Sequence, residues 1–558
     1  MGSRRKRLNR GVTGFGSKNQ ASWKGVALFA AAVGALDYLF TAWTWIGWNR
    51  RPGFAQDPWL IYARGIRDGL SVPMGNDHPL YPFVLSLWAS PAPEAFTYSK
   101  LLSLALGVLT VVWVYRIAAE RFDARAGLTA ALLLSMNWIH LALSMSLRAE
   151  VLLPPLALGA WYAVLKGFEG DRRWWFGAGA LSGIAYLAKG TGQLFALAWI
   201  GAWLLTVAFG GREGRGERIK AGAWFAAGFV PFAAILWWGN FALFGDPTYN
   251  FSSKHVMWLD SWNQVDASQT RHLSAGVYLK THGLSGAAKR LFGGMAMFVP
   301  VSIACLSPDG TFPVGYTLRW ILLAAGLAAV WGCRRRVFES LGRANGGTWF
   351  TAFLYGGFFI LFAWYHQVSS SERFIGVLNP IVFVLVAGAF AALWDRIRAA
   401  LSRFGGRLNF WSKTAVGLAA GVVFASTGIK ASVWGLARPF TTDRPPACYR
   451  EVFERVNGRD GVLYGPSGDL SYYQFDRRPQ VIEVPAGAPP PSLAEWLKGK
   501  VEMLVVDAGT MERPFLSGHF ERAGDRGVRL VHEIPGWRLS YLDPHHAPPH
   551  VMIFERSK

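Results

Sequence analysis

The chain has 558 residues, of which 52% are hydrophobic and only 16% charged, and its formal net charge is +22. Repeated apolar runs of about 20 residues exclude an ordinary soluble protein and indicate a polytopic α-helical membrane protein. The basic residues stand in short clusters between these runs, as they do in cytoplasmic loops. No extended basic domain could follow a phosphate backbone, so a nucleic-acid partner is excluded.

The N-terminal part predicts how the chain is oriented. Residues 1–24 are rich in Lys and Arg and contain no acidic residue, so they are expected in the cytoplasm. The apolar run behind them is longer than the core of a signal peptide, which indicates an uncleaved first span. About eleven spans in a plasma membrane then satisfy the positive-inside rule. They are expected at residues 25–46, 96–118, 127–145, 151–165, 174–187, 193–208, 221–244, 316–332, 349–365, 375–394 and 415–434.

Residues 25–435 would form one transmembrane domain with two large outer loops, at 48–95 and at 245–315. The second loop contains the apolar run 291–306, which is short and is broken by Pro300. We interpret this run as interfacial or re-entrant, because a spanning helix needs about 20 apolar residues.

Residues 441–558 have the composition of a soluble domain, and the topology places this domain outside the membrane. Strand-like runs alternate with helix-like segments, which predicts a small α/β domain. No glycine-rich phosphate loop and no nucleophile elbow occur in it, so it is expected to be a structural or acceptor-facing cap. The strands are expected at 461–464, 480–484, 501–506, 528–534 and 551–555, and one helix at 492–498.

Two acidic residues of the first outer loop, Asp57 and Asp77, stand among aromatics, prolines and arginines. Asp57 precedes Pro58 at the start of an amphipathic segment, a pattern typical of a helix N-cap on a membrane surface. The same carboxylate could act as a base, because a capping Asp can still face a cleft. Asp77 lies in a turn before Pro79. In the functional interpretation, Asp77 is a second carboxylate and His78 forms a polar wall of the site.

Isolated charges stand in three further outer turns: Arg148 with Glu150, Lys189, and Glu372 with Arg373. Ionisable groups at the ends of spans are costly unless they are paired, solvated or used. Snorkelling towards water would explain Lys189 and Arg373 without a function. Because all three turns share the face of the first loop, we expect a cationic pocket. A phosphate or pyrophosphate on a membrane lipid fits Arg and Lys in charge and geometry.

Six motifs along residues 25–400 carry a resemblance to a known family. They occur in the order A-Q-D-P-W-L-I-Y-A-R, D-H-P-L-Y-P-F-V, S-L-R-A-E-V-L-L, Y-L-A-K-G-T-G, G-D-P-T-Y-N and S-S-S-E-R-F-I-G-V-L-N-P. In the order of these motifs, and in the side of the membrane on which they are expected, the chain resembles the GT-C membrane glycosyltransferases. Within that class it is similar to the glycosyltransferase family 39 type, which contains the protein O-mannosyltransferases and the bacterial lipid A aminoarabinose transferase.

The resemblance implies a sugar donor linked to polyprenyl phosphate and transfer on the non-cytoplasmic face. In such enzymes the Asp of the first loop sits at the reacting centre, and here that residue is Asp57. Its implied role is to accept or orient the proton of the acceptor hydroxyl while Arg373 and Lys189 stabilise the leaving phosphate. Inversion at the anomeric carbon is expected. Many relatives have Asp-Glu where this chain has Asp57-Pro58, which leaves open whether Asp77 compensates.

No cofactor is expected. The outer loops contain no tight cluster of acids or histidines, so a divalent metal is possible but not favoured. The three cysteines, Cys305, Cys333 and Cys448, are too scattered along the chain for a metal motif or a disulfide framework.

Two other functions stay open at this stage. A polymerase or ligase of lipid-linked polysaccharides would also act outside the membrane, and the segment 245–290 is large enough to carry its catalytic residues. A transporter or flippase would be expected to show internal repeats with broken helices at the midplane, and we see no convincing repeat. The sequence leaves open whether a hexose or pentose is transferred, and whether the acceptor is a lipid, a glycan or a protein.

Overall fold

The computed structural model describes most of the membrane part and pieces of the C-terminal part. It covers residues 57–69, 72–90, 94–209, 214–261, 272–306, 346–401, 447–456, 501–508, 518–524 and 527–557, with a few shorter pieces. Outside the described residues lie the expected first and last spans, most of the eighth span, the strand 480–484 and the helix 492–498.

The membrane part is built from long helices joined by short helical turns. In chain order these are α2 (Asp57–Arg67), α3 (Leu80–Ser86), α4 (Glu94–Arg121), α5 (Ala124–Ser135), α6 (Trp138–Ser144), η1 (Ala149–Leu152), α7 (Leu153–Phe168), α8 (Arg173–Ala188), η2 (Gly190–Gly192), α9 (Gln193–Phe209), α10 (Arg215–Phe244), α11 (Phe251–Lys254), η3 (Val256–Trp258), α13 (Ala275–Ala304), α16 (Gly346–Tyr365), α17 (Arg373–Gly376) and α18 (Asn379–Leu401).

Within the described residues, seven helical segments are long and apolar enough to cross a membrane. They are Tyr98–Arg121, Ala149–Phe168, Gly190–Phe209, Arg215–Phe244, Ala275–Ala304, Gly346–Tyr365 and Asn379–Arg396. Large apolar side chains on these helices face outwards, for example Phe209 on α9 at 83% exposed and Trp238 on α10 at 75%. Lipid accepts such a surface whereas water does not. The predicted polytopic helical fold is confirmed.

α8 and α10 pack closely because small residues face each other. A Cβ placed on Gly179 would lie 2.0 Å from the carbonyl oxygen of Phe225. Small residues let helix backbones approach each other, and this is how helices associate in lipid, where burying apolar surface gives little gain. We conclude that this packing fixes α8, and with it the position of Lys189 directly after its last residue.

The expected third span, 127–145, is interrupted in the structure. α5 ends at Ser135 and α6 begins at Trp138, with an extended Asn137 between them. The Oδ1 atom of Asn137 accepts the backbone N–H of His140 at 3.0 Å and so caps α6. The apolar pattern concealed this break, because the polar side chain of Asn137 is satisfied inside the protein and not by water.

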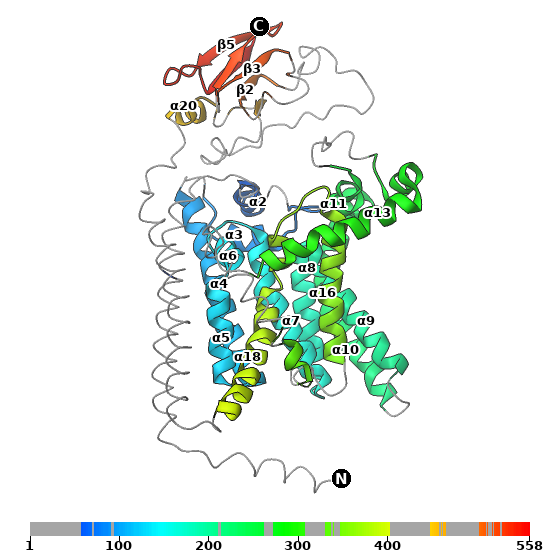
Figure 1. Cartoon of the computed structure of the whole chain (residues 1–558). Helices are drawn as coiled ribbons and strands as arrows, with labels where there is room; N and C mark the ends of the chain where they lie inside the picture. The colour runs from blue at the N-terminus through cyan, green and yellow to red at the C-terminus, as the bar shows by residue number, and fades with distance from the viewer. Residues whose placement is uncertain are drawn as a thin grey trace.

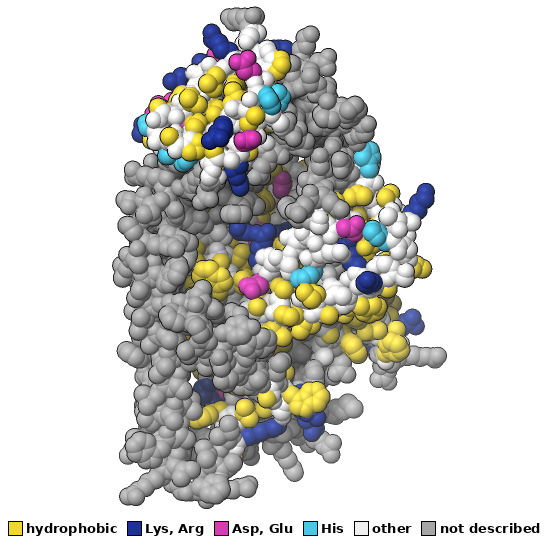
Figure 2. All heavy atoms as spheres, turned by 45° about the horizontal axis from the view of Figure 1, so that its top comes forward, with side chains coloured by type: hydrophobic (Ala, Val, Ile, Leu, Met, Phe, Trp, Pro, Cys, Tyr) yellow, Lys and Arg dark blue, Asp and Glu magenta, His cyan; other side chains and the backbone are white. Residues whose placement is uncertain are grey.

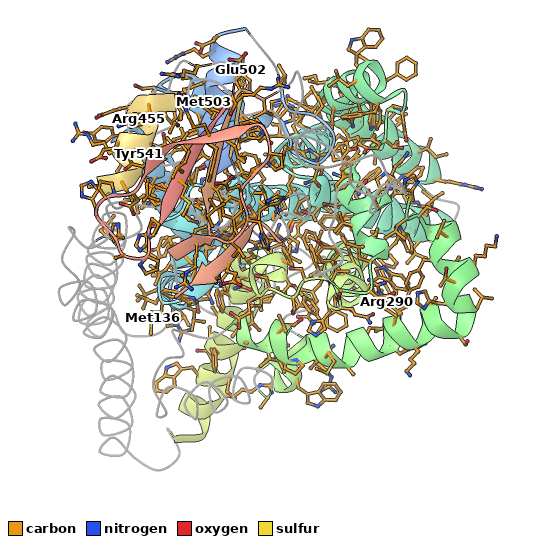
Figure 3. All side chains as sticks on the ribbon, turned by 90° about the horizontal axis from the view of Figure 1, so that it is seen from above. Met136, Arg290, Arg455, Glu502, Met503 and Tyr541 are labelled. Carbon is orange, nitrogen blue, oxygen red and sulfur yellow. The ribbon has the colours of Figure 1, made fainter. Side chains whose placement is uncertain are left out.

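The run 291–306 belongs to α13 and lies across the ends of two other helices. Nε of Arg290 donates to the carbonyl oxygen of Trp364, in the last turn of α16, at 3.2 Å. At the other end, the carbonyl oxygen of Cys305 accepts from Nδ2 of Asn379, the first residue of α18, at 2.7 Å. Figure 3 shows α13 from above, with Arg290 labelled. α13 is long and apolar enough to cross a membrane, and the interfacial placement of the run 291–306 stays a prediction.

The short elements gather at one end of the bundle, which we call the loop end. Figure 1 shows α2, α3, α6 and α11 there, with the C-terminal strands beyond them. The loop end includes α2, the loop 72–79, and the turns 146–152, 189–192, 250–258 and 372–378.

The C-terminal part contains a four-stranded mixed sheet in the order β1-β2-β6-β5. β1 (Val462–Tyr464) is parallel to β2 (Met503–Asp507), whereas β6 (Val551–Arg556) runs antiparallel to both β2 and β5 (Trp537–Leu542). β3 (Phe520–Ala523) and β4 (Gly527–Leu530) form a separate hairpin. α20 (Ala447–Val456) packs against the sheet, and its Arg455 lies over the ring of Tyr541 on β5 (Figure 3).

The strands that were predicted are those with buried apolar runs. β1, β2 and β6 coincide with the expected segments 461–464, 501–506 and 551–555, while β4 ends before the expected 528–534 does. β3 and β5 were not predicted, because most of their side chains are exposed or half-buried and no apolar run marks them.

Candidate active site

The proposed base, Asp57, is the first residue of α2. Pro58 follows it, as suits the first turn of a helix, and the expected start of an amphipathic helix is confirmed. Behind it, Leu60 and Ala63 are buried in the core of the bundle. These contacts anchor α2 at the loop end. The side chain of Asp57 itself lies outside what the structure describes.

The loop 72–79 is held by two asparagines that the sequence reasoning did not single out. The N–H of Gly75 donates to Oδ1 of Asn240 at 2.9 Å, and the carbonyl of Gly75 accepts from Nδ2 of Asn250 at 3.1 Å. Asn250 belongs to the G-D-P-T-Y-N motif after α10. Asn250 could have been identified by its position in a motif. Asn240 could have been identified as a polar residue near the end of an apolar helix.

Asp77 faces back towards α2. The hydroxyl of Tyr62, on α2, donates to Oδ2 of Asp77 at 2.5 Å, and Asp77 is half-buried. A charge-assisted hydrogen bond of this kind positions the carboxylate and occupies one of its oxygens. Asp77 therefore ties the loop to the helix that begins at Asp57.

His78 is buried against the turn that carries Lys189. Its ring lies 5.8 Å from that of Tyr186, and a Cβ placed on Gly190 would lie 3.3 Å from its Nε2. Within the described residues neither ring nitrogen has a partner with hydrogen-bond geometry. Burial lowers the pKa of His78 to about 4, with a further contribution from the Lys189 charge, and the nearby backbone of Tyr186 opposes this only in part. His78 is thus a neutral wall of the site.

The buried His78 predicts a pH dependence of stability. The pKa of His78 is about 4 in the folded chain against 6.5 for an ordinary histidine, so between these values only the unfolded chain takes up the proton. Stability is unaffected above pH 6.5 and is expected to fall by about 3 kcal/mol as the pH drops towards 4. Unfolding curves in detergent should show that the free energy of unfolding falls less steeply with decreasing pH in His78→Gln than in the wild type. An unchanged slope, or an equal change in the exposed His532→Gln control, would contradict this account.

Lys189, Glu150 and Arg373 meet at the loop end although they come from three separate turns. Nζ of Lys189 lies 2.6 Å from Oε1 of Glu150, and Nε of Arg373 lies 3.9 Å from the same oxygen. The Glu150 side chain is 9% exposed, whereas those of Lys189 and Arg373 are 29% and 31% exposed. We call these three residues the ion triad. The carboxylate is therefore buried and the two cations are more exposed.

The ion triad has a net positive charge, because its one carboxylate neutralises only one of its two cations. Nε of Arg373 is buried and has no hydrogen-bond partner within the described residues. Leaving a charged donor without a partner is costly, so this arrangement favours an anion as a further partner. Figure 2 shows a few basic side chains, in dark blue, close together near the middle of the face that it draws.

The remaining predicted residues lie beside the ion triad. Arg148 stands at the N-cap position of η1, just before Glu150, and is close enough to influence that carboxylate. Its backbone N–H donates to the hydroxyl oxygen of Tyr81. Glu372 precedes α17 and makes no ion pair with any residue the structure describes. The structure thus brings together His78, Arg148, Glu150, Lys189 and Arg373, and places Glu372 at the edge.

A buried polar clamp holds the turn that carries Arg373. Asn379 donates through Nδ2 to Oδ1 of Asn137 at 3.1 Å and to the carbonyl of Cys305 at 2.7 Å, and Asn137 donates to the same carbonyl at 2.8 Å. These bonds join α6, the end of α13 and the start of α18. The N-P pair at the end of the S-S-S-E-R-F motif is therefore structural, and it positions Arg373 a short way upstream.

Three solved structures are similar to this chain. The oligosaccharyltransferase of Archaeoglobus fulgidus in its apo form aligns over 87% of this chain and 69% of its own, with 14% identity and a TM-score of 0.50. The same organism's AglB, in complex with an inhibitory peptide and a dolichol-phosphate, aligns over 86% and 69% with 16% identity and a TM-score of 0.48. ArnT from Cupriavidus metallidurans bound to undecaprenyl phosphate aligns over 80% and 74% with 12% identity and a TM-score of 0.42. No curated protein sequence is significantly similar to the chain.

The helical bundle, its charged loop end and the small C-terminal sheet have the GT-C fold, as the order of the motifs predicted. Residues 76–238 match the family described as Dolichyl-phosphate-mannose-protein mannosyltransferase. The matched region runs from the loop with Asp77 and His78 through Glu150 and Lys189 to α10.

Proposed function

We propose that the chain moves a sugar from a polyprenyl-phosphate-linked donor to an acceptor on the extracytoplasmic face of a plasma membrane. The observation that carries this proposal is the ion triad, in which two half-exposed cations share one buried carboxylate. The family match over residues 76–238, to enzymes named for a dolichyl-phosphate sugar, supports the same donor class. In this proposal the N-terminus is cytoplasmic, and the loop end and C-terminal domain face outside.

The donor phosphate would bind on the exposed side of the ion triad, next to Lys189 and Arg373. Arg373 offers the unsatisfied Nε donor and a planar guanidinium that suits phosphate oxygens, and Lys189 offers a second charge. As the bond between the sugar carbon and the phosphate oxygen breaks, both electrons go to the phosphate. Cations placed there stabilise that charge, so the leaving group needs no proton.

The acceptor hydroxyl would lose its proton to Asp57 as its oxygen forms the new bond to the sugar carbon. Asp77 is a less suitable base, because Tyr62 already donates to one of its oxygens. We therefore assign Asp77 to positioning α2 and the loop 72–79. His78, buried and neutral, would contribute shape and would not carry a proton in the reaction.

Membrane vesicles that contain the full chain test the proposal. They are supplied with labelled polyprenyl-phosphate hexoses and pentoses and with lipid, glycan and peptide acceptors, and transfer of label is measured. Transfer to an acceptor supports the proposal and identifies the sugar. Movement of the lipid across the bilayer without transfer would instead indicate a flippase, and repeated extension of a lipid-linked chain would indicate a polymerase.

Arg373→Ala is expected to weaken donor binding by about 10- to 100-fold, because a charged hydrogen bond to phosphate contributes about 1.5–3 kcal/mol. The loss should appear in the donor KM. Arg172→Ala is the matched control, since Arg172 stands exposed at the start of α8 and pairs with Glu217 at 2.6 Å. Normal donor affinity in Arg373→Ala, or an equal loss in Arg172→Ala, would exclude Arg373 from the phosphate site.

A further inference from the structure

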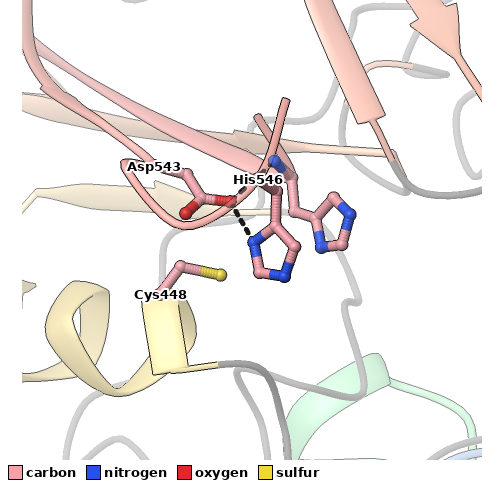
Figure 4. Close-up of side chains that lie close together, drawn as sticks. Cys448, Asp543 and His546 are labelled. Atoms are coloured by element: carbon pink, nitrogen blue, oxygen red, sulfur yellow. Dashed lines mark hydrogen bonds and ion pairs between the residues drawn. The ribbon is translucent and has the colours of Figure 1, made fainter. Parts of the chain in front are cut away.

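A second cluster of reactive side chains lies in the C-terminal domain, in a part to which the proposed reaction assigns no role. Cys448 is the second residue of α20, and Asp543, His546 and His550 belong to the loop between β5 and β6. One ligand atom from each of these four residues lies within 4.8 Å of every other. Figure 4 shows Cys448 reaching from α20 towards Asp543 and His546.

This proximity arises from the tertiary fold and has no counterpart in the sequence spacing. The cysteines were judged too scattered for a metal motif, and the loop D-P-H-H-A-P-P-H was not singled out. α20 packs against the sheet through the core that contains Cys448, Val452 and Val551. That packing places the Cys448 thiol over the loop that enters β6, about a hundred residues further along the chain.

The loop side of the cluster is already organised. Asp543 has a fully buried side chain and its Oδ2 accepts the N–H of His550 at 2.9 Å and a hydrogen bond from Nδ1 of His546 at 2.8 Å. The rings of His546 and His550 stack with centroids 3.7 Å apart. The N–H of His545 also donates to Oδ1 of Asp543 at 2.9 Å. These three hydrogen bonds fix the carboxylate in place.

We propose that Cys448, Asp543, His546 and His550 bind a zinc-class divalent cation. One sulfur, two imidazole nitrogens and one carboxylate oxygen form a donor set typical of tetrahedral zinc, whereas calcium and magnesium take oxygen ligands. In a tetrahedral zinc site with bonds of 2.0–2.3 Å the ligand atoms lie about 3.3–3.8 Å apart. Donors within 4.8 Å of one another reach that geometry by small side-chain rotations.

The charges also balance in such a site. Binding releases the Cys448 proton to solvent, and the thiolate with the Asp543 carboxylate then matches the charge of the cation. All four protein groups are ligands, so the site is closed in the manner of a structural metal and offers no open position for a substrate. It would join α20 to the β5–β6 loop and stabilise the C-terminal domain. The proposed metal site shares no residue with the ion triad, so this inference does not depend on the proposed reaction.

Full-length protein purified in detergent, treated with chelator and then given Zn²⁺, tests the site by metal analysis and thermal unfolding. We expect one tightly bound zinc per chain and a higher unfolding temperature, because a cation that binds only the folded state stabilises it. Cys448→Ser and His550→Asn should lower zinc affinity at least tenfold and remove the shift. His545→Asn is the matched control, since His545 belongs to the same loop but its ring bonds Glu451 at 2.7 Å.

Cobalt in place of zinc gives a spectroscopic readout that the wild-type chain provides by itself. Bound Co²⁺ in the wild-type chain should show the absorption of a tetrahedral ion with a thiolate-to-metal charge-transfer band, and Cys448→Ser should lose that band. Three results would overturn the proposal: no zinc bound by the wild-type chain, equal zinc binding in Cys448→Ser and His545→Asn, or a cobalt spectrum without a thiolate band. The first would make Cys448 a core side chain and Asp543 a turn-forming residue only.

Discussion

Asp57→Asn is expected to lower sugar transfer by about 10²–10⁴-fold, the range that a positioned general base contributes. Donor affinity and unfolding temperature should stay close to those of the wild type, because Asn is as well suited to the start of a helix as Asp. This substitution therefore separates the two interpretations of Asp57 as the first residue of α2. If the carboxylate only capped the helix, the Asn variant would remain active.

Two further variants sharpen the test of Asp57. Asp57→Ser keeps a small polar side chain at the helix start and removes the base, so it should be as inactive as Asp57→Asn and about as stable. Asp77→Asn can still accept the hydrogen bond of the Tyr62 hydroxyl through its amide oxygen. Its rate of sugar transfer should therefore fall by about tenfold at most, as expected of a positioning residue. Transfer measured with saturating donor in vesicles decides the matter. Full activity in Asp57→Asn, or a larger loss in Asp77→Asn, would move the base to Asp77.

The sequence predicted which turns meet at the loop end because helix direction alternates along a membrane chain. Once the spans were assigned, the turns with Glu150, Lys189 and Arg373 had to lie on the face of the first loop. What the pattern did not reveal was their pairing. A cationic pocket was expected, whereas Glu150 lies between two cations and neutralises one of them. Distances of this kind depend on helix rotation and tilt, which apolar patterns determine only loosely.

The polar residues that were missed share a physical property. Asn137, Asn240 and Asn379 lie in or beside apolar helices and make their hydrogen bonds inside the protein. In the sequence such a residue is a single polar position, which hardly changes the prediction of a span from the apolar run around it. In lipid, however, its amide must be satisfied, so it marks a place where helices are joined. The break after α5 and the clamp at the start of α18 both follow from this.

Lys189→Met and Glu150→Gln are expected to act in opposite directions on donor binding and in the same direction on stability. Removing Lys189 takes away the closest cation of the Glu150 carboxylate and leaves Arg373, at 3.9 Å, and Arg148. Removing the carboxylate leaves Lys189 and Arg373 without the anion that they share. Breaking a buried pair costs about 3–5 kcal/mol, and partial exposure of the two cations should reduce this to roughly half. Both variants should therefore unfold more easily without ligand.

Donor binding distinguishes a phosphate site from a structural ion pair. Lys189→Met should lose transfer and should no longer be stabilised by added polyprenyl phosphate. Glu150→Gln should bind polyprenyl phosphate more tightly than the wild type does, because a competing anion is gone, and the lipid should restore its unfolding temperature. The double variant should recover stability, since it removes both charges of the pair, yet stay inactive. If polyprenyl phosphate shifted the unfolding of all four proteins equally, the ion triad would only be holding η1 against α8.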